Sequence, residues 1–128
     1  MKQRITGPNV APPSGPYSPG LRVGDWIFVS GQGPIDPRTG QISGQTIEEQ
    51  TRQTLDNIKA ILEAAGASLD DCVKVTAHLR DMADFEAYNR VYETFFGDPK
   101  PARTTVQSGL AANMRVEIDV IAHRPTAG

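Results

Sequence analysis

The order of apolar and polar residues predicts a chain that alternates between strands and helices. Residues 26–29, WIFV, are apolar at every position, which is typical of a strand buried on both faces. Residues 73–79 alternate with period two, which predicts another strand. Two further strands are predicted at 102–107 and 115–122. The strand at 73–79 is expected to place on one face the side chains of Val73, Val75, Ala77 and Leu79.

Two segments have the period of amphipathic helices. Thr46 and Glu49 stand at capping-box spacing ahead of an apolar stripe, and Gly66 is placed to end that helix. A second helix is predicted to begin at Asp84, a favourable N-cap residue. Its apolar stripe, which Gly97 ends, consists of Phe85, Tyr88, Val91, Tyr92, Phe95 and Phe96.

The predicted elements follow the order of two or three strands, a helix, a strand, a helix and two strands. Two helices can cover only one face of such a sheet. The strand at 26–29 is nevertheless apolar on both faces, and Ile121 lies opposite the apolar face of the last strand. In a short chain the economical cover for the second face is another copy of the chain. We therefore predict a homo-oligomer whose sheets face an internal interface.

Length and composition favour a single globular domain over residues 1–128. The net charge is −2 and no run of Lys and Arg stands out, so the electrostatic footprint of a nucleic-acid binder is missing. The single cysteine, Cys72, excludes a disulfide framework within the chain. No apolar stretch has the length of a membrane span or the character of a signal peptide. We expect a cytoplasmic protein without membrane or nucleic-acid partners.

An arginine within a predicted strand, Arg103, is the first candidate for chemistry. Alternation places Arg103 and Thr105 on one face of their strand, and Glu117 and Asp119 on one face of the last strand. If these two strands pair near the middle of the sheet, Arg103 and Glu117 share the face away from the helices. Arg103 is then either a structural ion-pair partner of Glu117 or Asp119, or a clamp for the carboxylate of a ligand.

Glu117 also admits two interpretations. It is either a solvated or paired strand residue, or a group that orients a water molecule and accepts a proton. Two carboxylates on one strand, Glu117 and Asp119, are a weak signal for a glycosidase pair. On pattern alone, Tyr17 is a packed aromatic residue in a turn, and Asn89 is a solvent-facing residue of the second helix.

Other polar residues exclude some kinds of site. His78, His123 and Cys72 lack the spacing of metal ligands, so we predict no metal site. Ser30 and Gly31 lie in a glycine-containing segment that no helix follows, so this segment is not a phosphate loop. Its small residues still allow the backbone to approach a ligand closely.

Several segments together resemble the RidA (YjgF) family of reactive-intermediate deaminases. The match keeps its order and register from about Gly15 to Ala122, which makes it specific although each fragment alone is weak. The segments are GPYS (15–18), FVSGQ (28–32), DP and TG (36–40), QTRQ (50–53), NIKAIL (57–62), AAGAS (64–68), VKVT (73–76), DMADF (81–85), N with VY (89–92), PAR (101–103) and VEI (116–118).

The resemblance implies a chorismate-mutase-like α+β fold. This fold has a sheet of about six strands with two helices on one face, and it assembles as a homotrimer with sites in clefts between subunits. The resemblance also implies hydrolysis of enamines and imines, such as 2-aminoacrylate, 2-iminopropanoate and 2-iminobutanoate, to 2-keto acids and ammonia, without cofactor or metal. The alternatives are a non-catalytic, small-carboxylate-binding regulatory trimer and an RNA-cleaving protein, against which the acidic pI argues.

By position, the resemblance assigns Arg103 to the substrate carboxylate and Glu117 to the attacking water. The other site residues that it implies are Tyr17 lining the cleft, Ser30 and Gly31 at its floor, Asn89 beside it, and Thr105 through its backbone.

Three features depart from the family pattern. Gly33 stands where a bulky apolar residue is common, and Asp119 stands where glutamate is frequent. Residues 110–114 lack the expected Leu-Pro-Lys turn. These departures lie near the last two strands and leave the substrate preference open, whereas Arg103 and Glu117 are in place.

Overall fold

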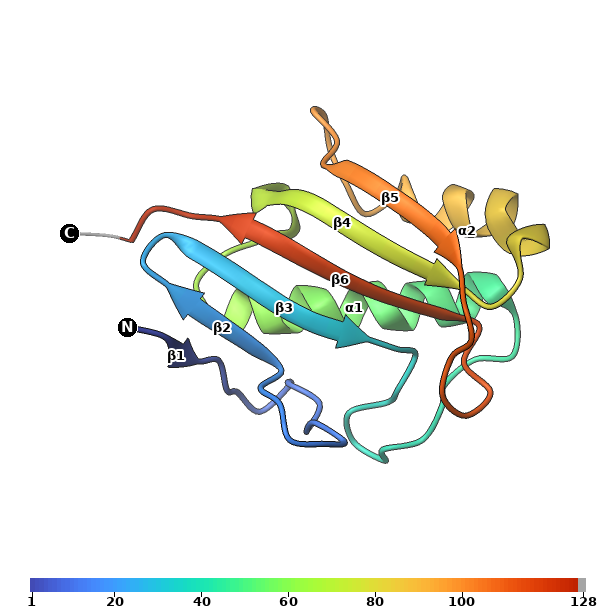
Figure 1. Ribbon diagram of the computed structural model, residues 1–128, viewed down its shortest axis with the longest axis horizontal. Coiled ribbons are helices and arrows are strands. Elements are labelled where there is room, and N and C mark those ends of the chain that lie inside the picture. The colour runs from blue at the N-terminus through green and yellow to red at the C-terminus, as the bar shows by residue number, and fades with distance from the viewer. Residues whose placement is uncertain (127–128) are drawn as a thin grey trace.

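The computed structural model describes residues 1–126 and holds one mixed sheet of six strands (Figure 1). The strands lie in the order β1-β2-β3-β6-β4-β5. The β4–β5 pair is parallel, and the other neighbouring pairs are antiparallel. Residues 127–128 of the predicted domain lie outside the described residues. The strands are β1 (Gln3–Arg4), β2 (Gly20–Val23), β3 (Trp26–Gln32), β4 (Cys72–Leu79), β5 (Ala102–Gln107) and β6 (Val116–His123).

Two helices, α1 (Ile47–Ala64) and α2 (Phe85–Tyr92), pack on one face of the sheet, behind it in Figure 1. Short 3-10 turns at Leu69–Asp71 and Met82–Asp84 precede β4 and α2. No helix in residues 1–126 is long and apolar enough to cross a membrane. The predicted fold class, a six-stranded α+β sheet with both helices on one face, is confirmed. The core between the layers includes Ile27, Leu55, Ile58, Leu62, Val75, Leu79, Tyr88 and Ile118.

Both ends of α1 follow the sequence prediction. The Thr46 hydroxyl accepts a hydrogen bond from the Glu49 N–H at 3.1 Å, and the Glu49 carboxylate accepts one from the Thr46 N–H at 3.1 Å. This reciprocal capping box provides hydrogen-bond acceptors for backbone N–H groups that have no partner within the first turn of the helix. At the other end, Gly66 has φ of 80°, a conformation that costs glycine little.

Alternation along β4 breaks at Val73. The pairing of β4 with β6 shifts register between Cys72 and Lys74, so Val73 forms a bulge and is 44% exposed. Cys72 is buried, as Val75 is. The prediction that Val73 shares a face with Val75 was wrong, because a strict period of two makes no allowance for an inserted residue.

The second helix begins where predicted and ends earlier. Asp84 is its N-cap residue, but the Asp84 carboxylate accepts hydrogen bonds from the Arg115 guanidinium at 2.9 and 3.0 Å rather than capping the helix. The helix ends at Tyr92, so Phe95 and Phe96 pack against the core from the segment that follows it. Phe95 and Phe96 were predicted as helical, and that part of the prediction was wrong.

β5 is an edge strand rather than a central one. It pairs with β4, and β4 separates it from β6. Arg103 lies opposite Val75 and Thr105 opposite Ala77, and both partners are buried on the face that the helices cover. The condition under which Arg103 and Glu117 would share the uncovered face, a pairing of β5 with the last strand, is therefore not met.

The opposite face of the sheet, here called the bare face, carries no helix among residues 1–126 (Figure 1). On it Trp26 and Phe28 are 45% and 42% exposed, whereas Ile27 and Val29 on the covered face are buried. Within one chain the strand at 26–29 is thus buried on one face only, which corrects the expectation of burial on both.

Candidate active site

One group of predicted site residues lines a cavity of about 630 Å³ on the bare face. These residues converge from the loop before β2, from β3 and from β6. The acidic side of the cavity is formed by Glu117 and Asp119, which alternate outward along β6. The predicted site residues in this group are Tyr17, Ser30, Gly31 and Glu117.

A β-bulge at Ser30 and Gly31 shapes the floor of this cavity. The β3–β6 register shifts between Val29 and Gln32, so these two residues lie opposite a single position of β6. A Cβ atom on Gly31 would lie 2.8 Å from Oε2 of Glu117, which is closer than such contacts allow. The missing side chain therefore lets the carboxylate lie directly against the backbone of the bulge.

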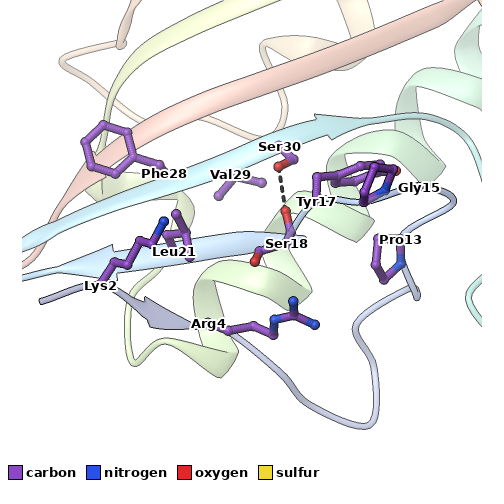
Figure 2. Close-up of a pocket in the computed structure, with 11 residues that line it drawn as sticks. Lys2, Arg4, Pro13, Gly15, Tyr17, Ser18, Leu21, Phe28, Val29 and Ser30 are labelled. Carbon is purple, nitrogen blue, oxygen red and sulfur yellow. Dashed lines mark hydrogen bonds between the residues drawn. The ribbon is translucent and has the colours of Figure 1, made fainter.

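The loop that carries Tyr17 is tied to this floor. The Ser30 hydroxyl donates a hydrogen bond to the Ser18 carbonyl at 2.6 Å, drawn as the dashed line in Figure 2. The Tyr17 hydroxyl lies 3.2 Å from that of Ser14, and the Tyr17 side chain is partly exposed at the cavity rim. The bond from β3 thus fixes the position of the loop relative to Glu117.

A second group of predicted residues surrounds Arg103 on the covered face. The Arg103 Nη1 donates to Oδ1 of Asn89 on α2 at 2.8 Å. The guanidinium carbon also lies 4.7 Å from the ring centre of Tyr92, 5.3 Å from that of Tyr88 and 5.7 Å from that of Phe85. Three aromatic faces at these distances stabilise the cation and hold its plane in one orientation.

Three buried hydroxyls belong to the same group. Those of Tyr88, Tyr92 and Thr105 have no hydrogen-bond partner within residues 1–126. Burial raises the pKa of Tyr88 and of Tyr92, and the charge of Arg103 opposes this rise in both. Both tyrosines therefore stay protonated at neutral pH and are available as donors.

Sequence reasoning missed this aromatic cage. The stripe Phe85, Tyr88 and Tyr92 was interpreted as core, and Tyr88 and Tyr92 are indeed buried. The sequence did contain a signal for it. An aromatic stripe on a helix, followed by an arginine in the next strand, predicts cation–π contacts between the two.

The two groups lie on opposite faces of the sheet within one chain. Arg103 has no carboxylate within ion-pair distance in the described part of the chain. Within one chain, Arg103 therefore forms no ion pair with Glu117 or Asp119. Glu117 lies on β6 opposite His78 of β4, on the bare face.

Two other ionisable groups, Asp119 and Cys72, have pKa values raised by burial. Burial raises the pKa of Asp119 above its ordinary value, and the charges of His78 and Lys74 oppose this rise. Burial, with the neighbouring charges of Asp71 and Asp70, raises the pKa of Cys72 to about 12, so its thiol stays protonated at neutral pH. No group of three or more metal-ligating side chains gathers anywhere in residues 1–126.

The structure gives a physical account of two departures from the family pattern. A Cβ atom on Gly33 would overlap the sulfur of Met114, so Met114 fills the space that a larger residue at position 33 needs. The segment 110–114 is held by Arg80, whose guanidinium donates to the carbonyls of Leu110, Ala112 and Met114 at 2.7–2.8 Å.

Known proteins match this chain along most of its length. The sequence profile of the family described as Endoribonuclease L-PSP matches residues 8–124. The chain belongs to this family. It is 50% identical over 125 residues to a RutC family protein of Pyrococcus horikoshii, covering 97% of this chain and 99% of that one.

An Escherichia coli protein named 2-iminobutanoate/2-iminopropanoate deaminase is 40% identical over 128 residues, covering 97% of this chain and 99% of that protein. The crystal structure of the E. coli YjgF gene product superposes with a TM-score of 0.90 at 39% identity, covering 95% of this chain and 98% of the other. The resemblance to the RidA (YjgF) family is thereby confirmed.

Proposed function

We propose that this protein hydrolyses imines and enamines of 2-amino acids to 2-keto acids and ammonia. The substrates that we expect are 2-aminoacrylate, 2-iminopropanoate and 2-iminobutanoate, the last two being those in the name of the E. coli relative. The observation that carries this proposal is the pair of complementary half-sites. One presents Arg103 without a carboxylate partner in residues 1–126, and the other presents a carboxylate, Glu117, in an open cavity.

A complete site then needs two copies of the chain. Because Arg103 and Glu117 lie on opposite faces, one chain does not bring them to the same substrate. Arg103 lies on edge strand β5, at the border of the sheet, where the bare face of a second copy can meet it. We propose a homotrimer in which Arg103 of one copy faces the Glu117 cavity of the next.

The Arg103 half-site is suited to a carboxylate. The guanidinium offers a planar fork of donors, and Asn89 and the aromatic cage hold it in place before a ligand arrives. The unpaired hydroxyls of Tyr88 and Thr105 are further donors beside it. In this role Arg103 holds the substrate carboxylate and orients C2 of the imine.

The Glu117 half-site is suited to water activation. Glu117 accepts a proton from a water molecule as its oxygen attacks C2, and the C=N π electrons pass to nitrogen. Nitrogen takes this proton from Glu117, which gives a neutral carbinolamine and restores the carboxylate. The carbinolamine then collapses as Glu117 passes the hydroxyl proton on to nitrogen and the C–N bond breaks, so that Glu117 is ionised again at the end. Ammonia leaves and a 2-keto acid remains, so the sum is imine plus water giving ketone plus ammonia. Tyr17 closes one side of this cavity.

The charges of the chain favour this reaction over the RNA cleavage that the family description names. The net charge is −2, and the Glu117 cavity carries two carboxylates and no cation among its lining residues. Phosphodiester backbones are bound through cationic surfaces, which this cavity lacks. A small-carboxylate-binding regulatory trimer is the remaining alternative, because it needs Arg103 but not Glu117.

A coupled assay tests the reaction. An amino-acid oxidase generates imino acids in situ, semicarbazide traps them, and semicarbazone formation is followed with and without this protein. We expect the wild type to suppress trapping, and Arg103→Ala and Glu117→Gln each to abolish the suppression. If Glu117→Gln retains full suppression, Glu117 has no part in the reaction. If the wild type suppresses nothing across several side chains, the regulatory alternative replaces the deaminase.

Mixing the two variants tests whether the site is shared. In trimers assembled from equal amounts of Arg103→Ala and Glu117→Gln chains, a site is intact where the Arg103 of one copy meets the Glu117 of the next. About a quarter of all sites meet this condition. Co-refolded mixtures should therefore recover about a quarter of the wild-type rate. A site contained within one chain predicts no recovery.

A further inference from the structure

A second cavity, of about 590 Å³, lies beside the Glu117 cavity and is bordered by two cations, Lys2 and Arg4 (Figure 2). We propose that this cavity is a subsite for a second anionic group on the substrate, and that imino acids with a side-chain carboxylate are substrates of this protein. This inference rests on the proposed function, since it assigns a substrate class to the same site.

Strand register places Arg4 on the bare face. Arg4 pairs with Leu21, Leu21 with Phe28, and Phe28 with Ile121, so these four side chains form a row across the face that carries Glu117. Lys2 lies just before β1 and lines the same cavity as Arg4. Figure 2 shows Lys2 beside Leu21 and Arg4 below Ser18, with Tyr17 farther along; all five residues line this cavity.

Charges are separated between the two cavities. The lining of the 590 Å³ cavity includes Lys2 and Arg4 and no acidic residue, whereas the lining of the Glu117 cavity includes Glu117 and Asp119 and no basic residue. Neither Lys2 nor Arg4 has a side-chain ion pair or hydrogen bond within residues 1–126. Two cations that no carboxylate of the described chain neutralises favour an anionic ligand in this cavity.

The two cavities adjoin each other. Four residues, Tyr17, Phe28, Val29 and Ser30, line both of them. Arg4 lies in the row that ends at Ile121, about 14 Å away across the sheet with two strands between them, and Glu117 lies four positions, about 13 Å, farther along β6. The side chains of Arg4 and Glu117 reach into this diagonal from its two ends, and a substrate whose second carboxylate extends from the reacting carbon toward Arg4 bridges the space between them. An imine derived from glutamate has this arrangement of groups.

The experiment compares two imines in the semicarbazide assay, one from glutamate and one from leucine, each produced by an L-amino-acid oxidase of matching specificity. The test variant is Lys2→Gln combined with Arg4→Gln. The matched control is Arg52→Gln combined with Lys59→Gln, which removes the same charge from exposed positions of α1 on the other side of the sheet.

We expect the test variant to lose about tenfold in kcat/KM for 2-iminoglutarate, the combined effect of two solvent-exposed ion pairs. Its kcat/KM for the leucine imine should stay within twofold, and the control should retain both rates. Added salt should narrow the difference between the wild type and the test variant for 2-iminoglutarate. Equal losses on both substrates, or none on either, overturn the subsite.

Binding of glutarate, followed by NMR chemical shifts, separates failure of the subsite from failure of the reaction. If the wild type hydrolyses the leucine imine and the test variant binds glutarate as tightly as the wild type, the subsite is wrong and the deaminase stands. If no imine is hydrolysed but glutarate binding weakens in the test variant alone, the reaction is wrong and the anionic subsite stands.

Discussion

The two half-sites differ in what holds them. Arg103 is fixed by side-chain packing, between three aromatic rings and Asn89 on the covered face. Glu117 is fixed by backbone geometry, against the Ser30–Gly31 bulge in an open cavity. Arg103, the proposed carboxylate clamp, is thus held by residues of the hydrophobic core, whereas Glu117, the proposed water-activating group, is nearly independent of that core. Four predictions test this division, in order of decreasing expected effect.

Substituting one aromatic residue in each half-site should give the largest difference in the free energy of unfolding. Tyr92 is 5% exposed and packs against Tyr88 and Phe96, so Tyr92→Ala should lower the free energy of unfolding by about 3–5 kcal/mol. Tyr17→Ala, on an exposed loop, should change it by about 0.5 kcal/mol or less. Urea denaturation at one protein concentration measures both. Equal losses would show that the two half-sites are equally part of the core.

Substitution of Gly33 tests whether packing against Met114 supports the chain at the end of β3. Gly33→Ala places a Cβ atom on the sulfur of Met114 and should cost about 1–3 kcal/mol of stability. In a Met114→Ala background the same change should cost clearly less, because the conflicting side chain is gone. A double-mutant cycle by urea denaturation measures this coupling. Additive effects would mean that Met114 moves aside freely.

Gly31 tests the backbone support of Glu117. Gly31→Ala pushes on the mobile end of a glutamate, so the fold should lose about 1 kcal/mol or less while imine hydrolysis falls at least about tenfold. Gly109→Ala is the matched control, since a Cβ atom there meets nothing within 4 Å. The semicarbazide assay and thermal melting measure the two effects. Unchanged activity in Gly31→Ala would remove the bulge from the catalytic argument.

Asp119 gives the smallest effect, on pH dependence. Its pKa is raised above the ordinary 3.8 by burial, so the folded protein holds this proton more tightly than the unfolded chain. Stability from this group is therefore lost as pH rises from 3.8 through the folded pKa. Asp119→Asn should raise the Tm relative to the wild type at pH 7 more than at pH 3. Asp56→Asn, at an exposed position of α1, is the control. If Asp119→Asn changes the Tm equally at both pH values, the raised pKa of Asp119 is contradicted.

Local signals were enough for much of the fold. The capping box of Thr46 and Glu49, the turn at Gly66 and the shared face of Glu117 and Asp119 all depend on neighbours in the sequence, and all were predicted correctly. The β4 bulge at Val73 was not predicted, because an inserted residue depends on the register with β6 rather than on the residues beside it.

The residues alone were enough to predict the covered face, the two helices and, through the family motifs, which residues to examine. The placement of Arg103 and Glu117 on opposite faces of the sheet became known only from the folded chain. The physical reason is strand order. Because β4 lies between β5 and β6, and β5 pairs with it in parallel, Arg103 shares a face with Val75 and not with Glu117. Alternation fixes which side chains of one strand share a face, but long-range pairing chooses the face that each set takes.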